Sequence, residues 1–313
     1  MAFAPPKETY SGKVFSINLG VVPAEVTFGG ENILPFHTFE GVSPNRPVIA
    51  YEIQDVPPVD WPEIVQKPYK DVSNDPVSWA KFCQENLKAR AIALRLIGTH
   101  PDRENRSPED AAKTVKDVLS AINVPLIILG SNHAEKDASV LVAAAEAAKD
   151  RNCIIGKAQE ANYKTIVAAA MANNLKLIAM SELDINLSKQ LNILITQMGL
   201  DKERIITDPM CSALGYGLEY TYSVMERIRL AALTQNDVVM QPPMLGDIGM
   251  FVWKIKETQA EEADIPEWGS VEDRGITWES VTATALLIAG AELLIMRHPK
   301  AVEAVEKVIE ELI

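Results

Sequence analysis

The sequence predicts an α/β fold, a (β/α)₈ barrel of the TIM type with an N-terminal β-hairpin extension. Eight short apolar runs alternate with helical patterns across residues 47–313. The runs are apolar throughout, and such strands need cover on both faces, as parallel strands in a barrel have. A closed barrel surrounded by helices therefore explains the pattern better than an open doubly wound sheet.

Residues 1–46 differ in pattern from the rest and are predicted to form an extension that packs on the barrel. Lys13–Leu19 and Ala24–Phe28 each alternate polar and apolar residues, and Gly20 and Pro23 interrupt the sequence between them. Two alternating runs around a turn signal are typical of a β-hairpin. We expect this hairpin to cover one end of the barrel, and we favour that position over a separate binding module.

The predicted barrel strands share β-branched and aliphatic residues bounded by turn signals. In order, they are Pro47–Ile53, Ala91–Ile97, Pro125–Leu129, Cys153–Lys157, Lys176–Met180, Arg204–Thr207, Asp237–Met240 and Leu293–Met296.

Helices between these strands are predicted from their caps and apolar spacing. Asp75-Pro76 and Ser107-Pro108 each combine an N-cap residue with proline at the first helical position. Further helices are expected at Ala134–Asp150, Tyr163–Asn173, Ile185–Met198, Trp278–Gly290 and Pro299–Leu312.

Segment 241–277 is predicted to be a long excursion of the barrel domain, residues 47–313. It separates the seventh predicted strand from the next helix and contains Phe251, Trp253 and Trp268 among many charged residues. Connections of this length usually have a function or local structure. Two interpretations stay open, a lid on the barrel rim and an element that docks a partner.

Composition excludes some classes of partner. The 313 residues include 43 acidic and 30 basic ones, for a net charge of -13. Such a surface does not favour nucleic acid or an anionic membrane. No apolar run reaches the length of about 20 residues that a membrane-spanning helix needs, and the first residues lack a signal-peptide pattern. We therefore expect a soluble, cytoplasmic protein.

The sequence contains no pattern typical of a metal centre. Cys83, Cys153 and Cys211 are far apart, and the four histidines form no H-x-x-H or H-E-x-x-H spacing. Neither a zinc site nor an iron–sulfur cluster can be built from this chain alone.

Two catalytic arrangements have weak support in the sequence. Glu52 and Asp208 would form a carboxylate pair, although rim acids more often pair with neighbours such as Arg95 or Arg297. Cys211 would need a nearby base and a lowered pKa to act as a nucleophile. We therefore predict no catalytic residue.

The residues after the predicted strands are rich in amides, hydroxyls and glycine, and in a barrel these strand ends form the functional face. His133 most simply caps the next helix. Two glycines beside Tyr216 suit the close approach of a flat ligand or a partner backbone. The candidate cofactor-binding residues are Asn132, Asp208, Gly215, Tyr216, Gly217, Gln241 and Pro242.

Three segments carry a family resemblance. They are VTFGGENILPFHTFEG (Val26–Gly41), DPMCSALGYGLEYTYSVMERIRLAAL (Asp208–Leu233) and ATALLIAGAELLIMRHP (Ala283–Pro299). In this order they closely resemble the small subunit of the corrinoid iron–sulfur protein, the delta subunit of acetyl-CoA decarbonylase/synthase. The resemblance covers essentially the whole chain. Its motif D-P-x-x-x-A-L-G-Y-G-L-E-Y is far more specific than a general barrel pattern.

The resemblance implies a heterodimer with a large corrinoid iron–sulfur subunit, which carries a four-iron four-sulfur cluster and a cobamide-binding domain. The cobamide, a cobalamin-type corrinoid containing cobalt, is expected between that domain and this barrel. The complex is expected to carry a methyl group from methyltetrahydrofolate methyltransferase to acetyl-CoA synthase in the reductive acetyl-CoA pathway of carbon fixation. This chain would be the small, non-redox subunit that caps the cobamide.

The matching positions carry over only in part. Asp208 and the Gly215-Tyr216-Gly217 segment match the family motif, without an implied role in proton transfer. Met210-Cys211-Ser212 stand where the family commonly has small residues. We therefore do not extend backbone contact with the corrin to these three positions.

Two alternatives remain open. The first is a stand-alone enzyme of the pterin-binding, methyltetrahydrofolate methyltransferase type. In that enzyme Asp208 and an amide, Asn132 or Gln241, would hold the pterin. The second is a structural docking subunit without contact to the ligand.

Overall fold

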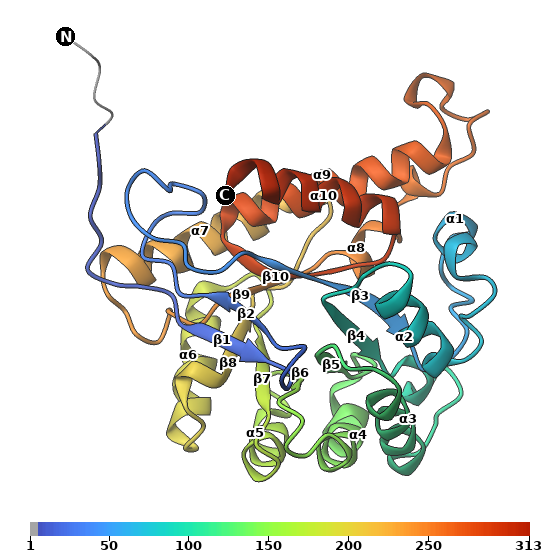
Figure 1. Cartoon of the computed structure of the whole chain (residues 1–313), viewed down its shortest axis with the longest axis horizontal. Helices are drawn as coiled ribbons and strands as arrows, with labels where there is room; N and C mark the ends of the chain where they lie inside the picture. The colour runs from blue at the N-terminus through green and yellow to red at the C-terminus, as the bar shows by residue number, and fades with distance from the viewer. Residues whose placement is uncertain (1–5) are drawn as a thin grey trace.

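A computed structural model of the chain describes residues 6–313 and contains a closed barrel of eight parallel strands (Figure 1). The first and last strands of the barrel pair with each other, so that Leu293–Met296 align with Val48–Tyr51. The predicted (β/α)₈ barrel is therefore confirmed. Its strands are β3 (Val48–Gln54), β4 (Ala91–Arg95), β5 (Leu126–Leu129), β6 (Ile154–Ala158), β7 (Lys176–Met180), β8 (Ile205–Asp208), β9 (Met244–Asp247) and β10 (Ala291–Met296).

Helices surround the barrel and bury their apolar faces against the outward side chains of the strands. Asp75 and Ser107 cap their helices as predicted, each accepting a backbone N–H in the first turn. The main helices are α2 (Pro76–Glu85), α3 (Pro108–Ala121), α4 (Ala134–Ala147), α5 (Tyr163–Ala172), α6 (Ile185–Gln197), α7 (Leu218–Thr234), α9 (Val271–Ala289) and α10 (Pro299–Leu312), and the short ones are α1 (Glu63–Gln66) and α8 (Gly249–Val252).

The N-terminal hairpin closes the end of the barrel where the strands begin. Strands β1 (Ser16–Leu19) and β2 (Val26–Gly29) pair antiparallel, as predicted, and Figure 1 draws them in blue across the barrel. The Gly20 N–H donates to the Asn152 carbonyl (3.0 Å) and the Phe15 N–H to the Gln241 carbonyl (2.9 Å). Asn152 and Gln241 both precede strands, so the hairpin lies at the N-terminal end.

The barrel interior is an apolar core that is continuous with this hairpin. Small and branched residues alternate inward along each strand, as the two-residue period of a strand requires. The hairpin contributes Ile17, Leu19, Val26 and Phe28 to this core, and the barrel contributes Val48, Ala50, Ala91, Ala93, Ile127, Leu129, Ile154, Ile178, Ile206, Leu245, Leu293 and Ile295.

The prediction for the seventh strand is wrong. Residues 237–240 form a turn, in which Met240 donates its N–H to the Asp237 carbonyl (2.9 Å) and Val239 donates its N–H to Asp237 Oδ1 (3.2 Å). The strand is β9, which begins at Met244. The two valines suggested a strand, but the aspartate side chain competes for the backbone N–H groups that a sheet needs.

This shift shortens the irregular connection to residues 248–270. It contains α8 and two 3₁₀ turns, Lys256–Thr258 and Pro266–Trp268, and Figure 1 shows it projecting beside α1. Helix α9 begins at Val271 instead of Trp278, because the Ser270 hydroxyl accepts the Asp273 N–H (3.0 Å) and caps it. Within residues 6–313, no helix combines the length and apolar character needed to cross a bilayer.

The hairpin is expected to contribute to global stability through Phe28, whose side chain is fully buried. Phe28→Ala should lower the free energy of unfolding by about 3–5 kcal/mol, because the truncation leaves a cavity at the end of the core. Urea denaturation measures the change. Val21→Ala, at an exposed position of the hairpin loop, is the control and should change stability by less than about 0.5 kcal/mol. Equal, small effects of both variants would show that the hairpin folds independently of the barrel.

Candidate functional site

A layer of buried charged side chains lies above the apolar core, where the barrel strands end. Most of these charged residues follow an inward apolar residue by two positions, as Glu52 follows Ala50 and Asp247 follows Leu245, so the backbone directs them to the barrel axis. All are 4 % exposed or less. We call this set the mouth charge network; it consists of Glu52, Arg95, Lys157, Asp208, Asp247 and Arg297.

One half of the network is built around Glu52. Its Oε1 accepts hydrogen bonds from Arg95 Nε (2.9 Å) and from Arg297 Nη2 (2.9 Å). Its Oε2 accepts from Arg297 Nε (3.0 Å). The Arg297 guanidinium carbon lies 4.4 Å from the centre of the Trp61 ring, which adds a cation–π contact on its other face.

The other half joins two aspartates through Lys157. Arg95 Nη2 donates to both carboxylate oxygens of Asp247 at 2.9 Å, and Lys157 Nζ lies 2.6 Å from Asp247 Oδ2. The same ammonium lies 2.7 Å from Asp208 Oδ2. Positive and negative groups therefore alternate from Arg297 through to Asp208, and three cations balance three anions.

This alternation favours the ionised forms of Glu52, Lys157 and Asp247. Burial by itself would raise the pKa of Asp247, but Arg95 and Lys157 outweigh it and hold that pKa well below its usual range. Burial likewise opposes ionisation of Glu52, yet Arg297 and Arg95 lower its pKa. For Lys157, burial favours the neutral amine, but the two aspartates raise its pKa. The carboxylates of Glu52 and Asp247 are thus held by cations and are weak bases near neutral pH.

Glu279 on α9 supports the network from behind. Its two carboxylate oxygens accept the backbone N–H groups of Arg297 (2.7 Å) and His298 (3.0 Å). These bonds fix the start of the loop from which Arg297 reaches Glu52. Burial raises the pKa of Glu279 to about 7, against the smaller opposing effect of the two backbone N–H groups.

Several buried polar atoms at the mouth have no hydrogen-bond partner within the described chain. Gln54 faces the mouth from β3, opposite Arg95 on β4, and both are almost fully buried. Gln54 Oε1, Arg95 Nη1 and Ser181 Oγ lack partners. Buried polar groups normally find protein or water partners. These atoms are therefore points where water or the polar edge of a ligand can bind.

The loop that follows β8 forms one wall of the mouth. Asp208 Oδ1 accepts the Met210 N–H (2.9 Å), which turns the chain sharply after the strand. Gly215 and Gly217 both have positive φ, +79° and +98°, and a side chain added at Gly215 would meet open space. The Tyr216 side chain is 47 % exposed, and its hydroxyl donates to Glu257 Oε2 (2.7 Å) in the excursion.

The loop after β5 forms another part of the rim. His133 caps α4, as predicted, because its Nδ1 accepts the Lys136 N–H (3.2 Å). Asn132 is exposed with φ +68°, and its side-chain Nδ2 lies 3.0 Å from Met250 Sδ. Asn132 and the Gly215–Gly217 loop therefore both lie on the rim.

Gln241 and Pro242 are at the other end of the barrel, so their predicted place among the residues after the seventh strand is wrong. Both precede β9, and the Gln241 carbonyl accepts the Phe15 N–H of the hairpin extension. The Gln241 side chain donates to Asn236 Oδ1 (2.9 Å). The reason is the position of the strand. A strand at residues 237–240 would place Gln241 and Pro242 after its end, but β9 begins at Met244, so both residues precede it.

Comparison with known proteins identifies the family. The family described as CO dehydrogenase/acetyl-CoA synthase delta subunit matches residues 16–308. The chain belongs to this family. It is 35% identical to the acetyl-CoA decarbonylase/synthase complex subunit delta of Methanocaldococcus jannaschii, over 97% of this chain and 75% of the relative. It is 34% identical to the subunit of the same name from Methanothermobacter thermautotrophicus, over 98% of this chain and 78% of the relative.

Solved structures share the fold of this delta-subunit chain at much lower identity. A dihydropteroate synthase from Coxiella burnetii in complex with pteroic acid matches with a TM-score of 0.57 and 14% identity, over 89% of this chain and 98% of the other. A dihydropteroate synthase from Thermus thermophilus matches with a TM-score of 0.55 and 12% identity, over 95% and 100%. At such identity the likeness concerns the fold alone.

The structure also answers the two catalytic arrangements considered from the sequence. Glu52 pairs with Arg95 and Arg297, as expected for a rim acid, and Asp208 pairs with Lys157. They are therefore not a free carboxylate pair. The Cys211 thiol of the delta-subunit chain is buried, and burial raises its pKa well above the usual range, so it is not an activated nucleophile.

Sequence reasoning missed Lys157 and Asp247 as members of the mouth. Lys157 was included in an apolar strand, and Asp247 fell inside the expected excursion. For Asp247 a signal existed, because a charge two positions after an inward leucine at a strand end repeats the pattern of Glu52 after Ala50. In residues 6–313 of this delta-subunit chain, no three His, Cys, Asp or Glu side chains gather as metal ligands.

Removing the central cation should strongly destabilise the delta-subunit chain. Lys157→Met leaves Asp208 and Asp247 without their shared partner, and breaking a buried pair costs about 3–5 kcal/mol. Urea unfolding at neutral pH measures the loss. The matched control is Lys113→Met, which removes an exposed pair with Asp117 and should cost less than about 0.5 kcal/mol. Similar losses in both variants would contradict a buried, mutually neutralised network.

Glu279 should make stability depend on pH. Its pKa is about 7 in the folded chain and about 4.5 in an ordinary setting, so the folded state favours the protonated form. The contribution of this group to the free energy of unfolding is therefore fully present below about pH 4.5 and is lost as the pH rises towards 7. The loss is roughly 3 kcal/mol, at ~1.4 kcal/mol for each unit of difference between the two pKa values.

Urea unfolding of the wild type and Glu279→Gln at several values between pH 4.5 and 8 tests this expectation. Glutamine cannot titrate, so the wild type should lose stability relative to the variant as pH rises through this window. Burial lowers the pKa of His298 to about 4. This residue is present in both proteins, so its contribution to the pH dependence is removed when their stabilities are subtracted. A difference in stability between the two proteins that does not change with pH would show that Glu279 is ionised in the folded chain over this whole pH range.

Proposed function

We propose that this delta-subunit chain caps a cobamide held by a large corrinoid iron–sulfur subunit. In this proposal the large subunit also carries the four-iron four-sulfur cluster, and this chain has no redox group. The complex then passes a methyl group from methyltetrahydrofolate methyltransferase to acetyl-CoA synthase. Membership of the delta-subunit family supports the assignment to the complex, and the features of the mouth support the role of a cap.

The mouth charge network is the observation that carries the proposal. In a barrel enzyme, catalytic groups normally project from the strand ends towards the substrate. Here the strand-end carboxylates Glu52, Asp208 and Asp247 are instead paired with cations of the same chain. The six side chains of the network are neutral overall, and each of their three carboxylates is paired with a cation, which suits a wall beside a cofactor more than a centre of acid–base catalysis.

The rim residues fit the chemistry of a corrinoid. A corrin is a flat ring with apolar faces and amide groups along its edge. The open space at Gly215 permits a flat group to approach the backbone, and the exposed amide of Asn132 can exchange hydrogen bonds with an amide edge. Gln54 Oε1 and Arg95 Nη1 are further buried groups that an amide or a bridging water would satisfy.

The histidines near the rim suit a cap rather than an axial ligand. His100, His133 and His298 each accept a backbone N–H at Nδ1, from Asp102, Lys136 and Lys300 respectively. That bond places the remaining proton on Nε2 in the neutral ring. When bound, the cobamide would carry the methyl group. The residues of this chain would orient the exposed face of the cobamide and exclude water.

The alternative is a pterin-binding methyltransferase, and one observation favours it. The fold is shared with dihydropteroate synthases, including one solved in complex with pteroic acid. Asp208 would have to leave Lys157 in order to bind a pterin, and Gln241 is at the opposite end of the barrel. The third interpretation, a docking subunit without ligand contact, is separated from the proposal by the experiment below.

Visible spectroscopy and two rim variants test the proposed cap. The isolated chain should be colourless, and corrin absorbance should appear only with the large subunit. Asn132→Gly and Tyr216→Ala should slow methyl transfer by the assembled complex several-fold, since both remove rim contacts without disturbing a buried group. Val238→Ala, at an exposed position in the loop before β9 at the far end of the barrel, is the matched control and should transfer methyl at the wild-type rate.

Each competing interpretation predicts a different result. Stoichiometric cobamide on the isolated chain would contradict the division of labour between subunits. Binding of methyltetrahydrofolate to the isolated chain with micromolar affinity, measured by calorimetry, would favour the pterin enzyme. Unchanged transfer rates in Asn132→Gly and Tyr216→Ala would leave the chain with a structural role only.

A further inference from the structure

The outer face of α9 is uncharged and carries exposed apolar residues, unlike that of a typical helix on a barrel surface. Residues 275–289 contain one charged side chain, Glu279, and it is fully buried beneath the helix. The neighbouring α10 instead presents charged residues such as Lys300, Glu303 and Lys307 to solvent. The outer positions of α9 hold Thr277, Ser280 and Thr284, whose hydroxyls donate to carbonyls of the helix itself, and the large apolar residues Val281 and Ile288. Helix α9 therefore has one face that the described residues leave uncovered.

Four apolar residues form a stripe along this face, of which Trp278 and Ala285 are half-buried against the core and Val281 and Ile288 are exposed. Trp278, Val281, Ala285 and Ile288 are spaced by three or four positions and so share one face of the helix. Val281 is 43 % exposed and Ile288 is 46 % exposed, although both are large apolar residues. We call these four residues the α9 stripe. Figure 1 shows α9 at the periphery of the barrel, beside α10.

Both ends of the α9 stripe continue into further apolar surface. At one end Trp268, itself 46 % exposed, stacks on Trp278 with ring centres 5.6 Å apart. At the other end a groove of about 320 Å³ opens between α7 and α9, where Leu230 and Ile288 face each other across exposed surface. Exposed apolar areas of this extent, with aromatic residues at one end, are typical of protein interfaces.

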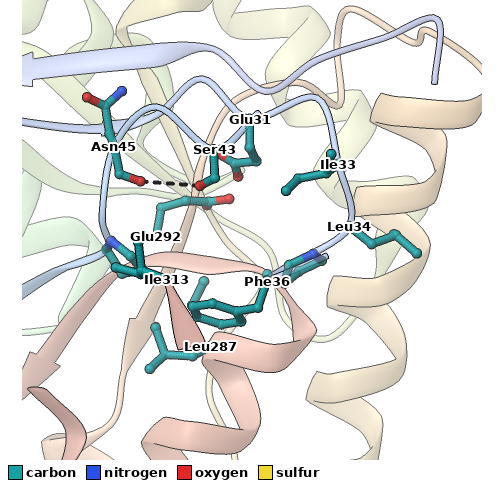
Figure 2. A pocket seen from close by; sticks show the side chains of 13 residues that line it. Glu31, Ile33, Leu34, Phe36, Ser43, Asn45, Leu287, Glu292 and Ile313 are labelled. Atoms are coloured by element: carbon teal, nitrogen blue, oxygen red, sulfur yellow. Dashed lines mark hydrogen bonds between the residues drawn. The ribbon is translucent and has the colours of Figure 1, made fainter. Parts of the chain in front are cut away.

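A second feature supports an interface, because the pockets around the molecule are not alike. The small pocket in Figure 2, of about 40 Å³, lies between the hairpin extension and β10. Its charged groups are already paired, since Glu31 and Glu292 both contact Arg229. The groove beside the α9 stripe is also bordered by the N-terminal extension, at Leu34 and Pro35, but it is larger, and Leu230 and Ile288 on its lining are exposed.

The charges around the stripe indicate the kind of partner. The excursion next to Trp268 is strongly acidic, and its exposed carboxylates have few cations among them. The acidic residues of this segment are Glu257, Glu261, Glu262, Asp264 and Glu267, and its basic residues are Lys254 and Lys256. A second copy of the chain would bring the same acidic excursion and a net charge of -13. Charge complementarity therefore favours a different, basic partner over self-association.

We propose that the α9 stripe and the adjoining groove dock a helix of a different polypeptide chain that carries basic residues where it meets the acidic excursion. The stripe spans about 15 Å along α9 at ~1.5 Å per residue, enough for about three turns of a partner helix. Apolar side chains of that helix pack on Val281 and Ile288, and its basic end lies beside Trp268 and the carboxylates. The proposal does not require the cobamide cap.

Site-directed labelling of the native complex tests the docking surface. Val281→Cys is nearly isosteric, and the natural cysteines Cys83, Cys153 and Cys211 are all buried. Val238→Cys is the matched control, since Val238 is 41 % exposed in the loop before β9. Maleimide should label the Val281→Cys variant at least tenfold more slowly in the complex isolated from the native cell than in the free chain. The Val238→Cys variant should be labelled at similar rates in both.

A thiol-to-amine cross-linker attached at position 281 tests the identity of the partner. We expect a cross-link to a lysine of a different subunit. Neutralising Glu261 and Glu262 to glutamine should also weaken assembly at low ionic strength and have little effect at high ionic strength.

Three results would overturn the proposal. Equal labelling of position 281 in the free chain and in the complex would show that the stripe stays exposed. Cross-links confined to a second copy of this chain, with a dimer in sedimentation, would replace the basic partner by self-association. Loss of assembly that does not depend on ionic strength in the glutamine variant would contradict a basic contact.

Discussion

The alternation of buried charges at the mouth is the constraint on which this barrel depends. Arg297, Glu52, Arg95, Asp247, Lys157 and Asp208 come from six different strand ends, and each is stable in the interior because its neighbours carry the opposite charge. Removing one member leaves an uncompensated buried charge, which is why such networks tolerate substitution poorly. The network therefore fixes the strand ends against one another and sets the shape of the rim.

The same network limits what the barrel can do. The hairpin fills the N-terminal end with Ile17 and Phe28, and the paired charges fill the opposite end. A ligand at the mouth would thus rest on a neutral, largely satisfied layer and meet the rim loops around it. The rim loops include Asn132, whose exposed side chain contacts Met250, and the Gly215–Gly217 loop, where Gly215 faces open space. These features are the ones on which the proposed role as a cap rests.

The barrel fold of this chain is shared far more widely than its family. Dihydropteroate synthases share the barrel at 14% identity or less in the examples compared, so the barrel tolerates almost complete replacement of its sequence. The delta-subunit relatives are 34–35% identical over nearly the whole chain. The charged mouth and the acidic excursion both lie at the strand ends, the usual active-site face, whereas the outer face of α9 lies on the side of the barrel.

The sequence by itself determined the barrel, the hairpin and the family, because these depend on local signals: apolar runs, helix caps at Asp75 and Ser107, and the long motif after Asp208. It also indicated that Glu52 pairs with arginines. The sequence misplaced β9, because Val238 and Val239 resemble a strand. The Asp237 side chain accepts the Val239 N–H and holds a turn there. Gln241 and Pro242 were therefore assigned to the wrong end of the barrel. Only the tertiary structure decided that Lys157 and Asp247 meet, because residues 90 positions apart become neighbours through barrel closure, which no local pattern encodes.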